Sequence, residues 1–534
     1  MNLMESALVG EVGTQSMQNT EIGARTARVA TSVLLGKVIV FVLAGASFII
    51  VARLLGPSTY GIYTLAIAII GIFGSVGDLG IGVSFNKFIP EYMSRNEHLK
   101  IKDLLANGYA MLLLFGGILT IPTFALSGVF STYIFHSAAY SGLIEIASFL
   151  ILLSILYGDS YSALIGFGKN KGIAVTATVE AAAQSSVSIA LAVLGFGAAA
   201  PIIGLVAGYG FGIVSALMAI RGFTSRSSGV SVSVQKIREL LKFSLPVGIS
   251  NIMGAAVSSI SLVVLGLFAT SIVVGNFGVA SRTGSMIDLI TGSISVSLIT
   301  MYSTAISLNK SHGEISRFYN YSLYLAFVLI APLLFFVGIL STPFSYTVFS
   351  GVYKLAPVYI SIMAFGILIG LFSTYAYNLM ISAKRVNSVL KYSAATAAVQ
   401  FVLLPFLVPV LKGVGLALLM FVVAPIVGDV LYAYGLSRVL YVNVDFWKVG
   451  RVLLANVISF AFVVMAMLVL KDAFIPVLIV SAALVLLIYP PVLSLVGALK
   501  RKDVEIIKRT AGDVPIVGAA VNGILSYASL FTRG

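Results

Sequence analysis

The stretch ARLLGPSTYGIYTLA, residues 52–66, lies at the junction of two long apolar segments, residues 29–51 and 62–82. Each segment is long enough to cross a membrane, because about 20 helical residues at ~1.5 Å rise span a hydrocarbon core of ~30 Å. Gly56 and Pro57 predict a break between them, since proline cannot continue the first helix and fixes φ for a turn. Ser58 or Thr59 is suited to cap the second helix. The stretch therefore predicts a hairpin between two membrane-spanning helices.

The composition is that of a polytopic membrane protein. Of the 534 residues, 59% are hydrophobic and only 10% are charged, and the mean hydropathy is +1.06, which exceeds what a soluble core needs. The sequence has no cysteine, so disulfides, thiol nucleophiles and cysteine metal sites are excluded. The net charge of +14 is spread over the loops between apolar segments. We therefore expect no nucleic-acid partner.

The apolar segments predict an all-α membrane protein with about 14 transmembrane helices. The expected spans are residues 29–51, 62–82, 104–127, 143–165, 173–196, 199–220, 245–269, 278–303, 321–341, 357–381, 392–411, 414–437, 451–470 and 474–496. With a cytoplasmic N-terminus, 27 of the 33 lysines and arginines fall on the cytoplasmic side, as the positive-inside rule requires. We therefore expect both termini in the cytoplasm and the protein in the plasma membrane.

An internal repeat organises these spans. Residues 60–66 (YGIYTLA) match residues 274–280 (VGNFGVA) at a glycine, an aromatic residue and an alanine, with an offset of 214, and Lys169 and Lys384 match with an offset of 215. Transporter folds are often duplicated in this way. Because both copies start inside and contain six spans, we expect two parallel six-helix lobes plus two C-terminal helices.

The repeat and the charge pattern give the expected domain boundaries. Residues 87–105 and 234–243 mix apolar and charged side chains at helical spacing, which predicts helices at the membrane interface. The expected parts are a cytoplasmic leader at 1–28, a first six-helix lobe at 29–221, an amphipathic cytoplasmic linker at 222–244, a second six-helix lobe at 245–440, two additional transmembrane helices at 441–497 and a basic cytoplasmic tail at 498–534.

Two cations inside the spans are candidates for binding a substrate head group. A charge at the bilayer centre costs ~3 kcal/mol or more. Lys37 lies about eight residues, or ~12 Å, into the first span, and Arg282 lies a few residues into the eighth, where snorkelling is an alternative. If the opening hairpins of the two lobes face each other, both cations reach one central cavity suited to phosphate or pyrophosphate. Otherwise each is an interhelical salt bridge or an interfacial anchor.

Acidic and hydroxyl side chains inside the spans are candidates for lining the cavity or for ion coupling. Asp78 follows a stripe of glycines and is either an ion-coupling carboxylate or a salt-bridge partner within the first lobe. Asp288, Thr291 and Ser295 form a polar stripe at helical spacing, and Glu180 lies in a span rich in alanine and serine. Three further acids lie near predicted helix ends, where we expect most of them to be interfacial: Glu145, Asp159 and Asp429.

The sequence lacks the residues that several kinds of catalysis and metal binding require. The sequence has no GxxxxGK[ST] loop for cradling phosphates, so we do not expect ATP hydrolysis. Its three histidines lie in separate loops without metal-ligand spacing. We therefore expect no catalytic residues, no metal and no cofactor, and transport against a gradient would be coupled to protons, sodium or the membrane potential.

With these features in place, the chain resembles the polysaccharide biosynthesis (Wzx-type) branch of the multidrug/oligosaccharidyl-lipid/polysaccharide (MOP) flippase superfamily. The resemblance rests on ARLLGP (52–57) with YGIY (60–63), on GDLGI (77–81) with NKFIPEY (86–92), and on the Lys-Arg pair at 384–385. It implies two six-helix lobes around a central cavity and movement of lipid-linked oligosaccharides across a membrane. The implied partners are the lipid-linked oligosaccharide, membrane lipids and glycan-assembly enzymes.

The sequence thus predicts a transporter rather than an enzyme: a flippase for a polyprenyl phosphate or pyrophosphate sugar that works by alternating access. A multidrug or organic-cation antiporter of the same superfamily is the main alternative, but it would need an acidic cavity, which Lys37 and Arg282 disfavour. A membrane glycosyltransferase or polysaccharide polymerase is more remote, because it would need a large outward loop and none is predicted.

Overall fold

A computed structural model describes most of the chain. The described residues are 2–77, 79–224, 232–308, 310–470 and 473–499, together with 504, 523, 526–527 and 529–531. Within the described helices, the side chains of residues 2–37, 222–224, 243, 246–255, 288–297 and 300 lie outside the description. All structural statements below concern the described part.

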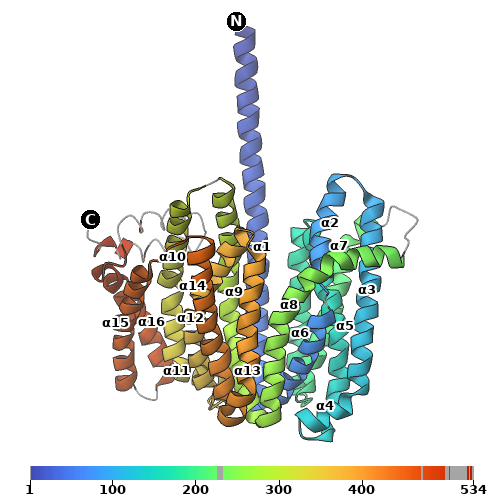
Figure 1. The fold of residues 1–534 in the computed structure, drawn as a ribbon, viewed down its shortest axis with the longest axis vertical. Coiled ribbons are helices and arrows are strands. Elements are labelled where there is room, and N and C mark those ends of the chain that lie inside the picture. The colour runs from blue at the N-terminus through green and yellow to red at the C-terminus, as the bar shows by residue number, and fades with distance from the viewer. Residues whose placement is uncertain are drawn as a thin grey trace. The chain divides into compact units, whose positions relative to one another are not determined.

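The described residues are helical and contain no strand (Figure 1). In chain order the elements are α1 (Asn2–Gly77), α2 (Ile81–Ser94), α3 (His98–Ala125), α4 (Ser127–Ile134), the 3-10 turn η1 (Ala138–Tyr140), α5 (Ser141–Gly166), α6 (Asn170–Val193), α7 (Ala199–Thr224), α8 (Val234–Phe268), α9 (Ser271–Ser307), α10 (His312–Ile339), α11 (Ser341–Phe349), α12 (Ala356–Ser382), α13 (Val386–Leu418), the π-helical η2 (Leu419–Val423), α14 (Ala424–Val439), α15 (Phe446–Leu470) and α16 (Phe474–Leu495).

The predicted break in the first hairpin is confirmed. Helical geometry in α1 is interrupted at Gly56, whose φ of 68° and ψ of 172° suit a residue without a side chain, and Pro57 follows directly. A second break lies inside α13 at Lys412, where φ is 50°, between the two spans predicted at 392–411 and 414–437. Both breaks fall where the sequence predicts that the chain turns back.

Ten segments of the described chain are long and apolar enough to cross a membrane. Two of them, Val38–Gly77 with 40 residues and Val386–Val439 with 54 residues, are about twice or more the ~20 residues that one crossing needs. The prediction of an all-helical membrane protein is confirmed. The exact number of 14 crossings stays a prediction.

Helix boundaries repeat with the offset found in the sequence. Helices α3 and α10 begin at His98 and His312, which are 214 positions apart, and each contains 28 residues. The short helices that follow, α4 and α11, begin at Ser127 and Ser341, again 214 apart. The backbone therefore supports the duplication inferred from residues 60–66 and 274–280.

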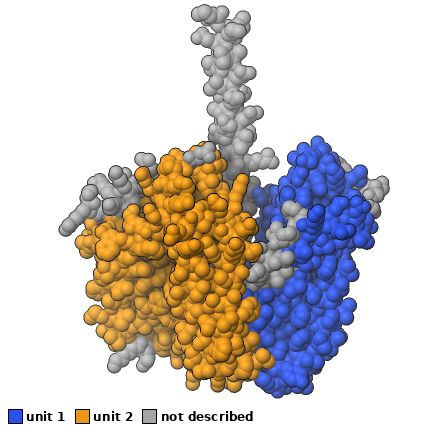
Figure 2. Space-filling model, in the orientation of Figure 1, with its two compact units in different colours: residues 1–55, 62–263 blue, residues 56–61, 264–534 orange. Residues whose placement is uncertain are grey.

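The chain divides into two compact units, coloured separately in Figure 2. Unit 1 contains residues 1–55 and 62–263, and unit 2 contains residues 56–61 and 264–534. The segment 234–243, predicted as an amphipathic helix in the linker, is helical and is continuous with α8. Lys236 in these turns is paired with Asp103 of α3 at 2.6 Å. The boundaries predicted for the two six-helix lobes stay a prediction.

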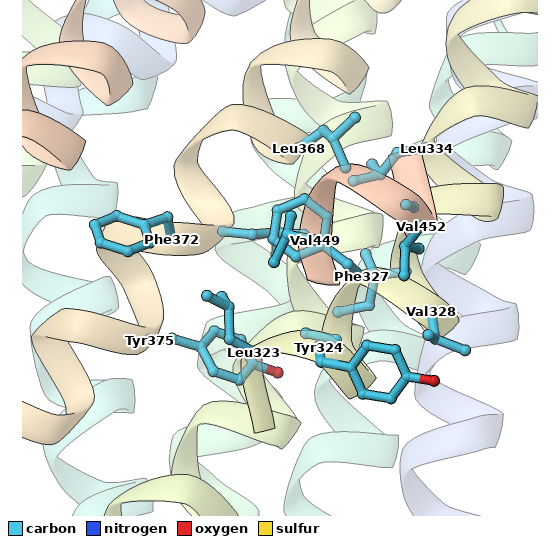
Figure 3. Packing of buried hydrophobic residues seen from close by; sticks show 14 of the residues in the cluster. Leu323, Tyr324, Phe327, Val328, Leu334, Leu368, Phe372, Tyr375, Val449 and Val452 are labelled. Carbon is cyan, nitrogen blue, oxygen red and sulfur yellow. The ribbon is translucent and has the colours of Figure 1, made fainter. Parts of the chain in front are cut away.

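Each unit has its own apolar core. In unit 2 the core joins α10 and α12 to α15, as Figure 3 shows for Phe327, Phe372 and Val449. Because α15 and α16 share this core, the two C-terminal helices are packed parts of unit 2. The core of unit 1 contains fully buried residues from α2, α3 and α5, such as Phe85, Met111 and Ile151.

A close helix contact in unit 2 joins the two sequence repeats. A Cβ added at Gly61 would overlap the carbonyl oxygen of Ser271, and a Cβ added at Gly275 would overlap the carbonyl oxygen of Pro57. Each added Cβ would also lie 2.9 Å from the amide nitrogen of the other glycine. The contact is symmetric, because each glycine lies against the residue four positions before the other glycine: Gly61 against Ser271, and Gly275 against Pro57. A hydrogen bond of 2.9 Å between the hydroxyls of Ser58 and Ser271 lies beside it.

We predict that Gly61→Ala and Gly275→Ala each lower the melting temperature of the purified protein. An alanine stabilises a helix by about 1 kcal/mol relative to a glycine. Here, however, its methyl group would meet backbone atoms that cannot move aside, and such overpacking costs about 1–3 kcal/mol or more. Gly117→Ala is the control, because nothing lies within 4 Å of its added Cβ. Melting temperatures for both variants equal to or above that of Gly117→Ala would contradict the close contact.

Candidate functional site

The predicted site residues divide into those that the structure describes and those that it does not. Side chains that lie outside the described residues are Lys37, Asp78, Asp288, Thr291 and Ser295. Their roles stay predictions. Arg282 and Glu180 are described, and they lie in different compact units.

Arg282 lies on the exposed side of α9. The opposite side of this helix packs on α12, where Gly284 leaves room for the side chain of Met363 and the buried Thr283 hydroxyl donates to the carbonyl oxygen of Val279 at 2.9 Å. Arg282 itself is exposed and forms no salt bridge among the described residues. The packing of α9 therefore presents a guanidinium group that is accessible to an anion.

The depth of Arg282 in its helix is greater than the sequence predicts. The span was expected to begin near residue 278, whereas α9 begins at Ser271. Arg282 is thus eleven residues from that end, or ~16 Å along the axis. Whether this arginine snorkels to the surface or faces a cavity stays a prediction.

Glu180 lies beside a group of tyrosines in unit 1. The rings of Tyr157 on α5 and Tyr209 on α7 are stacked with centroids 5.2 Å apart, and Tyr161 lies 6.2 Å from Tyr157. Gly212 makes this packing possible, because a Cβ there would lie 2.6 Å from the ring of Tyr157 and 3.2 Å from the Cβ of Glu180. We call Glu180, Tyr157, Tyr161 and Tyr209 the tyrosine cluster. Sequence analysis missed the three tyrosines, since they come from helices far apart in the chain.

The tyrosine cluster offers two kinds of recognition. Aromatic faces with a carboxylate attract organic cations, and a carboxylate with phenolic hydroxyls can also hydrogen-bond neutral hydroxyl groups. With the repeat offset of 214, the positions equivalent to Tyr157, Glu180 and Tyr209 are Leu371, Ala394 and Val423. Tyr161 corresponds to Tyr375, so the second repeat keeps one tyrosine of the cluster but lacks the carboxylate and the stacked pair.

Two of the carboxylates expected near helix ends are covered by protein side chains. Asp159 on α5 is buried, with 3% of its surface exposed. Asp429 on α14 is half-buried and lines an apolar cavity of about 320 Å³ in unit 2, beside Phe327, Phe372 and Phe446. Its carboxylate accepts a hydrogen bond of 2.9 Å from the backbone N–H of Ser373. This cavity could not be predicted from the sequence, because three other helices contribute to its lining.

The fold is shared with membrane transporters of known structure. It is similar to a structure described as the lipid II flippase MurJ in an inward closed conformation, with 16% identity, 87% of this chain and 98% of that chain covered, and a TM-score of 0.71. An inward-facing multidrug resistance MATE family transporter of the MOP superfamily matches with 15% identity, coverage of 74% and 94%, and a TM-score of 0.60. A MOP superfamily transporter from Pyrococcus furiosus matches with 17% identity, coverage of 78% and 96%, and a TM-score of 0.52. At these identities the likeness shows a shared fold.

The family model of the polysaccharide biosynthesis proteins matches residues 27–306, more than half of the chain. The chain belongs to this family. A search of curated protein sequences finds no match. The predicted family is thereby confirmed, and the protein is a multi-pass helical membrane protein whose fold resembles that of the transporters above.

We predict that Asp429→Asn raises the melting temperature at pH 8. The amide oxygen can keep the hydrogen bond from Ser373, while the substitution removes a charge whose burial in an apolar cavity is costly. The control is Glu239→Gln on the exposed surface of α8, where a change within about 0.5 kcal/mol is expected. A marked loss of stability in Asp429→Asn alone would show instead that the charge is needed by the fold.

Proposed function

We propose that the protein is a flippase that translocates a lipid-linked oligosaccharide, a polyprenyl phosphate or pyrophosphate sugar, across the membrane. The observation that carries the proposal is the exposed guanidinium of Arg282 in α9, a 37-residue helix that the sequence predicts to cross the membrane, in a member of the polysaccharide biosynthesis family. A cation in such a place requires a reason, because its burial in the membrane is unfavourable without an anion.

The anionic head group of such a substrate is complementary to the positive charge of Arg282. Arg282 forms no salt bridge among the described residues, and a phosphate or pyrophosphate would supply an anionic partner. The planar guanidinium can donate to two phosphate oxygens at once. Lys37 is proposed as a second cation for the same group. The polyprenyl tail stays in the bilayer, where its transfer into a protein cavity would gain little.

Alternating access is the proposed mode of movement. The chain forms two compact units, which is the division that a rocking mechanism requires. Asp78, Glu180, Asp288, Thr291 and Ser295 are the proposed cavity-lining or ion-coupling residues, and protons, sodium or the membrane potential would drive the cycle. We place the protein in the plasma membrane with both termini in the cytoplasm, where enzymes of glycan assembly would supply the substrate.

An organic-cation antiporter is the second candidate, and the tyrosine cluster is the observation that favours it. Glu180 beside stacked tyrosines is suited to a cation with an apolar surface. For an antiporter, however, the exposed Arg282 would repel the substrate. The two functions therefore predict opposite charge preferences for binding.

We predict that Arg282→Gln weakens binding of a fluorescent polyprenyl-pyrophosphoryl sugar to the purified protein by about tenfold or more, since a hydrogen bond to a charged group contributes about 1.5–3 kcal/mol. Arg282→Lys should bind with an affinity between those of the unaltered protein and Arg282→Gln, because lysine keeps the charge but cannot donate two parallel hydrogen bonds to a phosphate. The matched control is Arg317→Gln, an exposed arginine in the first turns of α10, which should bind as the unaltered protein does.

Competition experiments separate the two candidate functions. Free pyrophosphate should displace the fluorescent sugar lipid, and an organic-cation dye should not. Displacement by the dye alone, with unchanged affinity in Arg282→Gln, would favour the antiporter and leave Arg282 without a role in binding.

A further inference from the structure

We propose that unit 1 contains a binding site for an anionic phospholipid, in the groove between α3 and α7. The lipid phosphate lies at Lys102 and Arg221, and one acyl chain lies along the apolar walls below them. The groove has a volume of about 540 Å³ and is lined by these two cations and by apolar residues of both helices. This site is distinct from Arg282 and from the tyrosine cluster.

Both cations lie at the same end of the groove. On α3 the lining face is formed by Lys102, Ala106 and Tyr109, and Lys102 is four residues after the helix begins at His98. On α7 the lining face includes Val214 and Arg221, and Arg221 is three residues before the helix ends at Thr224. Because the two helices run in opposite directions, the beginning of one meets the end of the other.

The walls of the groove below the cations are apolar and accessible. Val214 and Met218 of α7 are 49% and 69% exposed. Each wall extends seven residues from its cation, to Tyr109 on α3 and to Val214 on α7, which is ~10 Å along a helix axis. A groove that is charged at one end and apolar over the rest has the polarity of a phospholipid.

The described lining of the groove contains two cations and no carboxylate. The acidic neighbour, Asp103, is ion-paired with Lys236 of α8 at 2.6 Å. Lys169 reaches the same region and donates to the carbonyl oxygen of Ala219 on α7 at 2.5 Å. An anionic head group is therefore favoured over a zwitterionic one, whose choline would meet further cations. A soluble phosphate would gain nothing from the apolar walls.

The test is native mass spectrometry of the purified full-length protein, titrated with phosphatidylglycerol or phosphatidylcholine of the same chain length. The double variant Lys102→Ala/Arg221→Ala removes the head-group cations. Ala106→Trp keeps both cations and fills the groove with an indole ring. The double variant Lys391→Ala/Arg438→Ala, which removes two exposed cations of unit 2, is the matched control.

We expect the unaltered protein and the control to bind phosphatidylglycerol at least tenfold more tightly than phosphatidylcholine. Both groove variants should lose this preference, and millimolar inorganic phosphate should not displace the lipid. Equal binding of the two lipids, an unchanged preference in both groove variants, or displacement by inorganic phosphate would overturn the proposal. Ala106→Trp keeps the test decisive if the charge-removal variant folds poorly. No outcome depends on the transported substrate.

Discussion

The contact between Gly61 and Gly275 is the constraint on which much of unit 2 depends. Two helical segments meet there without side chains between them, and each glycine lies against a carbonyl oxygen of the other segment, at Pro57 or Ser271. Small residues allow this approach in a membrane, where the hydrophobic effect does not drive helices together and close packing must do so. The contact fixes the first turns of α9, and the packing of α9 on α12 then decides that Arg282 is exposed.

The duplicated backbone carries different chemistry in its two copies. With an offset of 214, Arg282 corresponds to Ala68, Asp429 corresponds to Ser215, and Glu180 corresponds to Ala394. Helix boundaries are kept between the copies, while these three charged side chains are not. The exposed guanidinium of Arg282 and the tyrosine cluster are therefore features of one copy each.

Much of the fold follows from local rules in the sequence, whereas the site follows only partly. The break at Gly56 was predictable because proline and glycine act on their own backbone, and the repeat was predictable because a glycine, an aromatic residue and an alanine recur in register. The continuity of residues 234–243 with α8 was not, since an amphipathic stretch can lie at the interface or extend a span. Tyr157 and Tyr209 were missed because their contact joins separate helices. The start of α9 was placed too late because the span was bounded by hydropathy, whereas the helix begins at Ser271.

The most direct test of the central claim is translocation in proteoliposomes that contain the purified protein and a fluorescent polyprenyl-pyrophosphoryl oligosaccharide. A membrane-impermeant quencher, added outside at successive times, measures how fast the sugar moves between leaflets. Our account predicts protein-dependent movement that is slowed at least tenfold by Arg282→Gln and is unchanged by an organic-cation dye. Movement no faster than in protein-free vesicles, across pH, sodium and voltage gradients of both directions, would contradict a flippase for lipid-linked oligosaccharides.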